Sequence, residues 1–220
     1  MTVTVDELEV ADPPDAWTRA GFSVDPGGDA GPVCRVGDVR IRLGGTDRGT
    51  GIIGWSLRGL PPQGSFDHLD GIPTTRSTST SDSAIAPPAM HPNGVTAIDH
   101  VVLLSPDLDR TIASMAAADL APRRERDGEL GGRPMRQVFF RLGEVILEVV
   151  GSPGSAGRGP STLWGITYVV ADIDATAGYF GDHTAPIKDA VQPGRRISTV
   201  RHKNFGMSVH TAVISATPDR

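Results

Sequence analysis

One carboxylate stands out because it lies in a segment that is otherwise apolar. Residues 140–151 read FRLGEVILEVVG, and apolar side chains occupy both sets of alternating strand positions there until Glu148 interrupts them. A carboxylate that leaves water without a partner costs several kcal/mol, roughly, or takes up a proton. Glu148 therefore needs a partner that can satisfy its charge.

The residues that could pair with Glu148 are of two kinds. His100 lies in the apolar run IDHVVLL and is either a hydrogen-bonded core histidine or the neighbour of Glu148. The other candidates are arginines on predicted strands, namely Arg141, Arg196 and Arg201. The sequence alone leaves both kinds of partner open.

A second group of residues has the chemistry for binding a substrate. Pro193 and Gly194 predict a turn, after which Arg195 and Arg196 open a strand. An arginine such as Arg141 or Arg196 that points inward would bind a carboxylate or phosphate, and one that points outward would be solvated. Trp164 is a candidate for lining an apolar pocket, although aromatic residues on strands also form ordinary core.

The elements that must position these residues repeat along the chain. Residues 98–104 predict a strand, Ser-Pro-Asp then caps a helix, and Leu108, Ile112 and Met115 share one helix face. Residues 164–180 repeat the strand, the Asp-containing turn and a short helix. Further strands follow each helix, so the sequence predicts two tandem β-α-β-β-β modules.

The first 60 residues contain a weaker copy of the same module. The segment CRVGDVRIRLGG aligns with FRLGEVILEVVG, which places Arg42 opposite Glu148. The first strand of this copy places Glu7 opposite His100. GIIGWSLRGL resembles the first strand of a further copy that is cut short. The chain therefore divides into a degenerate module (1–60), a Pro/Ser/Thr-rich linker (61–94) and a two-module domain (95–220).

Composition excludes several classes of function. The net charge of -5 and the isoelectric point near 5.6 provide no basic surface for nucleic acid or for an anionic membrane. No long apolar run suggests a membrane span or export signal, so a cytoplasmic protein is expected. Cys34 is the single cysteine, which excludes an internal disulfide and favours a packing role for this thiol.

These modules resemble the vicinal oxygen chelate superfamily, which comprises glyoxalase, bleomycin-resistance and extradiol-dioxygenase proteins. The resemblance covers Val95 to Ser215 best and implies an α+β fold of curved, cup-shaped mixed β-sheets with helices on the outer face. It also implies a divalent metal, Zn, Ni, Mn or Fe, held by His100 and Glu148. In that case Glu148 would also act as the catalytic base.

The other ligand positions depart from the pattern of the superfamily. Gly165 stands opposite His100 in the second module, and Val213 stands opposite Glu148. Glu7 or His210 would have to complete the metal site. Two functions therefore stay open: a metal-dependent lyase, isomerase or dioxygenase acting on a small oxygenated metabolite, and a metal-free protein that sequesters a small molecule.

Two further expectations follow from the sequence. The remaining histidines lie in predicted loops or turns and are expected to be solvated; they are His68, His91, His183 and His202. The modules could pair within one chain or between two chains of a homodimer, and the sequence does not decide between these arrangements.

Overall fold

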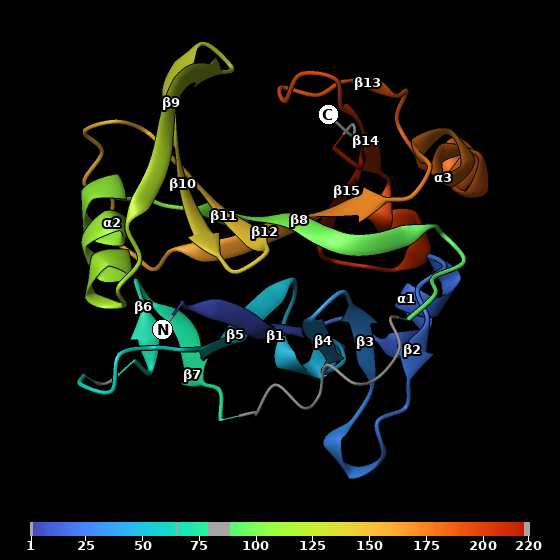
Figure 1. The fold of residues 1–220 in the computed structure, drawn as a ribbon, viewed down its shortest axis with the longest axis horizontal. Helices are drawn as coiled ribbons and strands as arrows, with labels where there is room; N and C mark the ends of the chain where they lie inside the picture. Colours follow the sequence, from blue (N-terminus) through green and yellow to red (C-terminus); the bar gives the residue numbers. More distant parts are fainter. Residues whose placement is uncertain (1, 65, 79–88, 218–220) are drawn as a thin grey trace.

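The computed structural model describes residues 2–64, 66–78 and 89–217 (Figure 1). Within these residues the strands are β1 (Thr4–Val10), β2 (Val24–Asp25), β3 (Val33–Val36), β4 (Val39–Leu43), β5 (Ile52–Arg58), β6 (His68–Leu69), β7 (Ile72–Arg76), β8 (Val95–Leu104), β9 (Pro122–Leu130), β10 (Arg133–Leu142), β11 (Val145–Gly151), β12 (Thr162–Val170), β13 (Lys188–Asp189), β14 (Arg196–Val200) and β15 (His210–Ser215). The α-helices are α1 (Pro14–Arg19), α2 (Leu108–Ala117) and α3 (Ile173–Phe180).

The two predicted modules after residue 94 are present. The first runs β8, α2, β9, β10, β11, and the second runs β12, α3, β13, β14, β15. In each module the last strand lies parallel to the first, and β8 joins the modules by pairing antiparallel with β12. Asp107 and Asp172 cap α2 and α3 by accepting hydrogen bonds from backbone N–H groups of the first helical turn. The predicted fold class, with curved mixed sheets, is confirmed.

The N-terminal half repeats this arrangement in the same register. Strand β4 lies parallel to β1 with Glu7 opposite Arg40, just as β11 lies parallel to β8 with His100 opposite Ile146. Both first strands also contain a register shift at an acidic residue, Asp6 in β1 and Asp99 in β8. The alignment of Glu7 with His100 and of Arg42 with Glu148 therefore holds in three dimensions.

The segment 61–94, expected to be an extended connector, contains two strands. β6 and β7 form a hairpin, and β7 adds to the sheet beside β5. Two apolar side chains anchor it, because Leu69 and Ile72 are 2% and 3% exposed. The tight turn between them uses positive φ angles at Asp70 and Gly71. Residues 79–88 of the same segment lie outside the described residues.

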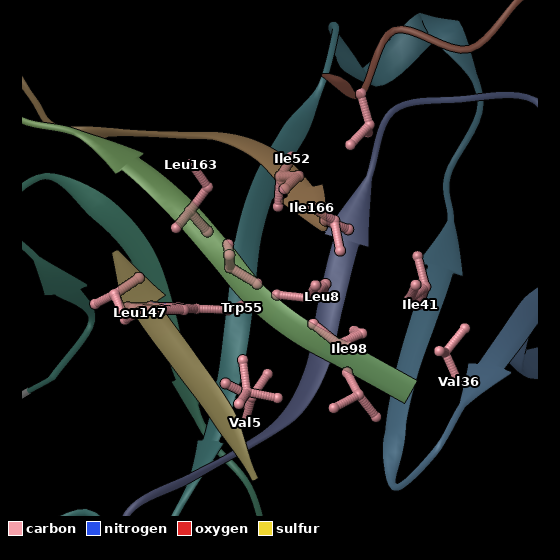
Figure 2. Close-up of a cluster of buried hydrophobic side chains, with 14 of the residues drawn as sticks. Val5, Leu8, Val36, Ile41, Ile52, Trp55, Ile98, Leu147, Leu163 and Ile166 are labelled. Carbon is pink, nitrogen blue, oxygen red and sulfur yellow. The ribbon is translucent and has the colours of Figure 1, made fainter. Parts of the chain in front are cut away.

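The main core lies between the two halves of the chain. Figure 2 shows Val5, Leu8 and Trp55 of the N-terminal half facing Ile98 and Leu147 of the C-terminal half, and all five are buried. In Figure 1, β1, β4 and β5 accordingly lie below β8 and β12, while β9 and β14 rise on the opposite side. Strand alternation directs the side chains between these core residues to that opposite face. We call it the upper face of β8, β11 and β12.

His91 is buried at the junction of the two halves, so its predicted exposure to solvent is wrong. Its Nδ1 accepts a hydrogen bond from the Ser23 backbone N–H at 3.0 Å, and its Nε2 lies 2.9 Å from the Arg35 carbonyl oxygen. Burial lowers the pKa of His91, although the bond to Arg35 opposes this effect. A neutral imidazole satisfies both contacts and joins residues far apart in the sequence.

Candidate functional site

The partner of Glu148 is His100. Nε2 of His100 lies 3.5 Å from Oε2 of Glu148, and the two side chains are 13% and 14% exposed. Parallel pairing of β8 with β11 brings them together, because His100 stands opposite Ile146, two residues before Glu148. Of the two kinds of partner left open by the sequence, the structure selects the histidine.

The other nitrogen of His100 is held by Asp99. Nδ1 lies 2.7 Å from Oδ2 of Asp99, and Nη1 of Arg195 lies 2.5 Å from the second carboxylate oxygen. Burial alone would raise the pKa of Asp99, but the hydrogen bonds from His100 and Arg195 outweigh it and lower this pKa. The register shift at Asp99 allows both neighbours to take part, since strict alternation would direct Asp99 and His100 to opposite faces.

Glu148 is held from the opposite side by an amide. Gln137 of β10 donates a hydrogen bond from Nε2 to Oε1 of Glu148, and its own Oε1 accepts one from Nε of Arg126 at 2.7 Å. The polar groups therefore form one chain across the upper face, in the order Arg195, Asp99, His100, Glu148, Gln137 and Arg126. Such a network fixes the rotamers of its members.

The donors present do not complete a site for a resident divalent cation. Gly165 takes the place of His100 in the second module, as predicted. The place of Glu148 is taken by Ala212, because Glu148 pairs with Val102 and Ala212 pairs with the equivalent Thr167. The described residues contain no cluster of three or more His, Cys, Asp or Glu side chains able to hold a metal ion. Structural and catalytic metal sites commonly use three or four protein ligands.

The prediction of Val213 at that position is therefore wrong by one residue. Val213 is fully buried and pairs with Tyr168. The suggested completing ligands have other partners: Glu7 pairs with Arg40 and Arg42 in the N-terminal half, and His210 stacks on an aromatic ring.

Two arginines proposed for substrate binding have partners elsewhere. Arg141 lies 3.3 Å from Glu144 at an exposed hairpin. Arg196 forms two hydrogen bonds, of 2.9 and 2.6 Å, with Asp174 of α3. The turn at Pro193–Gly194 directs the preceding arginine of the pair, Arg195, inward.

Trp164 is the third proposed contact, and it lies on the upper face. It is 43% exposed and stacks on His210, with ring centroids 4.0 Å apart and 14° between the planes. His202 contacts the other side of this cluster, 4.7 Å from the His210 ring. His202 is 7% exposed, so its predicted solvation is also wrong. Burial is the main cause that lowers the pKa of both histidines.

Comparison with known proteins identifies the fold. No family model and no curated protein matches the sequence. Among solved structures, a mutant of 4-hydroxymandelate synthase from Streptomyces coelicolor superposes with a TM-score of 0.68 at 16% identity, over 100% of this chain and 94% of that chain. A xylose isomerase-like TIM barrel/4-hydroxyphenylpyruvate dioxygenase fusion protein gives a TM-score of 0.62 at 16% identity, over 100% of this chain and 49% of that chain.

This chain therefore has the fold of the vicinal oxygen chelate superfamily. Identity this low establishes the fold alone, and the chemistry must come from the site. Separately, none of the helices in the described ranges has the length and apolar character to cross a membrane.

Sequence reasoning missed most of the polar chain around His100 and Glu148. Asp99 had a usable signal, since it directly precedes His100, and Arg195 was named with Arg196 as an arginine that could point inward. Gln137 lies on the same strand face as Arg141, which alternation indicates. Arg126 lies in the charged run RRERD and carried no signal that distinguishes it from a solvated residue.

Proposed function

We propose that this chain is a metal-free protein that binds a small molecule on the upper face of β8, β11 and β12. The observation that supports this function best is the direct contact of His100 with Glu148. In the second module the two equivalent positions hold Gly165 and Ala212, which have no ligating side chains. His100 and Glu148 are the one pair with the residue types that the superfamily uses for metal, and hydrogen bonds within the protein already hold both: Asp99 accepts one from His100, and Gln137 donates one to Glu148.

The N-terminal half has a comparable pair of polar side chains. There the two equivalent positions hold Glu7 and Arg42, joined by hydrogen bonds of 2.8 Å. Each half thus carries a pair of complementary polar side chains at the position where the superfamily binds metal. The pair in the C-terminal half is partly exposed, and the exposed Trp164 lies on the neighbouring strand β12, so we assign the ligand to that face.

A second candidate is the metal-dependent lyase, isomerase or dioxygenase, and one observation favours it. The Nε2 and Oε2 atoms are 3.5 Å apart, close to the separation of two ligands bound at about 2.1 Å in a tetrahedral site. Asp99 also orients His100 as outer-shell carboxylates orient metal-bound histidines. Further donors would then have to come from the substrate, water or another chain.

Metal analysis of the full chain, purified without chelator, separates the two candidates. The metal-free protein is expected to contain far less than one equivalent of Mn, Fe, Ni or Zn and to show the same melting temperature after each ion is added. The exposed His183, changed to Ala, controls for adventitious binding by histidine. Stoichiometric metal that is lost in His100→Ala but kept in His183→Ala would refute the proposed function and support the enzyme.

A further inference from the structure

We infer that the ligand is a planar ring compound with a hydrogen-bond donor, held between the indole of Trp164 and the carboxylate of Glu148. This inference rests on the proposed function and adds the chemical class of the ligand. It follows from how the chain builds and orients the Trp164 ring, and from what lies opposite that ring.

Trp164 reaches the upper face through an irregularity in β12. Leu163 pairs with Leu103 and Gly165 pairs with Val102, so Trp164 is an extra residue in the ladder. A β-bulge of this kind re-aims a side chain, and bulges are over-represented next to functional sites. The bulge explains how a large apolar side chain stays 43% exposed between a buried leucine and a buried glycine.

The next residue has to be glycine for the ring to be supported. A Cβ added at Gly165 would lie 2.7 Å from the His210 carbonyl oxygen and 2.9 Å from the His210 Cβ. His210 therefore stacks on Trp164 only because position 165 carries no side chain. Burial, followed by the charges of His202 and Lys203, lowers the pKa of His210, so the supporting imidazole is neutral near pH 7.

The strand order implies that the side of the indole away from His210 is turned toward Glu148. His210 comes from β15, and the strand order is β15, β12, β8, β11, so His210 covers the ring from the side away from β8. The side of the ring away from His210 faces β8 and, beyond it, β11. Strand alternation places Val102 and Leu104 of β8 on the upper face of the sheet, between Trp164 and Glu148, and Leu104 is 38% exposed.

The distance between Trp164 and Glu148 and the chemistry of these two side chains define which ligands fit. Trp164 and Glu148 lie on strands two positions apart, a span of about 10 Å at about 4.8 Å per strand. The Glu148 carboxylate only accepts hydrogen bonds, and Gln137 already donates to one of its oxygens. A ligand with a flat ring at one end and a hydroxyl or amino donor at the other would use both the indole and the second oxygen.

Calorimetry with matched probes tests this class in buffer containing EDTA. The probe 2-naphthol is planar and has a donor, 2-methoxynaphthalene is planar without a donor, and decahydro-2-naphthol has a donor without a planar ring. We expect 2-naphthol to bind, and each comparison probe to bind about tenfold more weakly or worse, because each loses one of the two contacts.

Variants test whether 2-naphthol binds at Trp164. Trp164→Ala should weaken 2-naphthol binding about tenfold, and Trp164→Phe should keep it within about threefold, because a phenyl ring can still stack. The control is Tyr179→Ala, which removes an exposed aromatic ring on α3 and should change nothing.

Nuclear magnetic resonance of the 15N-labelled protein gives a readout that a purely structural role would not move. Of the three tryptophans, Trp17 and Trp55 are 0% and 1% exposed, so Trp164 is the one that a ligand can reach. Titration with 2-naphthol should shift the indole N–H signal of Trp164 and leave those of Trp17 and Trp55 in place.

Several results would overturn the inference. They are the absence of 2-naphthol binding at millimolar concentration, equal affinity for decahydro-2-naphthol, and unchanged affinity in Trp164→Ala. Failure of the proposed function gives a different pattern, in which 2-naphthol binds with the expected dependence on Trp164 only after EDTA is removed and a metal is supplied.

Discussion

Replacing Arg195 tests whether the polar chain on the upper face is built as described. Arg195 and Asp99 are each 8% exposed in their side chains, and their closest N···O distance is 2.5 Å. Nε of Arg195 also donates to the Ser215 carbonyl oxygen at 2.8 Å. Arg195→Met keeps most of the apolar stem and removes all these hydrogen bonds, so it leaves a buried carboxylate with one partner fewer.

The expected cost is set by the group left behind. Breaking a buried ion pair on one side costs about 3–5 kcal/mol when the remaining charge has no other partner. Asp99 retains its hydrogen bond with His100 at 2.7 Å, so we expect a loss of about 2–4 kcal/mol in the free energy of unfolding. The matched control is Arg196→Met. Arg196 is the neighbouring residue, but its pair with Asp174 is exposed, so the control should stay within experimental error.

Urea denaturation followed by circular dichroism measures both variants, provided that the slope with denaturant is unchanged. The reasoning is refuted if Arg195→Met and Arg196→Met lose equal stability, or if the Arg196 variant is the less stable. Either result would mean that the turn at Pro193–Gly194 directs the arginines differently from the structure described.

Three further predictions concern other parts of the fold. Gly165→Ala should lower the free energy of unfolding by about 1–3 kcal/mol and increase acrylamide quenching of tryptophan, because the added Cβ would displace His210. Burial lowers the pKa of His91 in the folded protein, so as the pH falls the unfolded chain takes up a proton at this histidine before the folded chain does. The free energy of unfolding should therefore decrease below about pH 6.5. In urea titrations at several pH values, His91→Gln should show a smaller decrease. Asp70→Ala should cost about 2–4 kcal/mol, because this carboxylate, whose side chain is 3% exposed, joins the β6–β7 hairpin to α2 through Thr111 and Arg110; limited proteolysis should then cut near the hairpin first.

Much of the fold could be predicted because each repeat contains recognisable turn and helix-cap residues. An apolar strand followed by Ser-Pro-Asp or an Asp-containing turn defines the start of each module after residue 94, and both helix caps occur where expected. The β6–β7 hairpin could not be predicted in the same way. Its anchor consists of Leu69 and Ile72, too few apolar residues for periodicity to distinguish a strand from a connector.

The site was predicted less completely, and the reason is the phase of strand alternation. His100 and Glu148 were found because each is a polar residue in an apolar strand. The register shift at Asp99 adds a residue to the ladder, so alternation misplaces its side chain. A one-residue uncertainty likewise gave Val213 in place of Ala212, and it led to Arg196 being proposed for substrate binding although Arg195 is the inward arginine of the two, since one residue reverses the face of a strand.

A crystal structure of the protein grown with excess Mn²⁺, with an anomalous-difference map calculated around His100 and Glu148, tests the central claim most directly. We predict no anomalous peak between them and a separation of Nε2 from Oε2 near 3.5 Å. A peak at about 2.0–2.3 Å from both atoms would contradict it, because the pair would then be holding a cation in place of its internal contact.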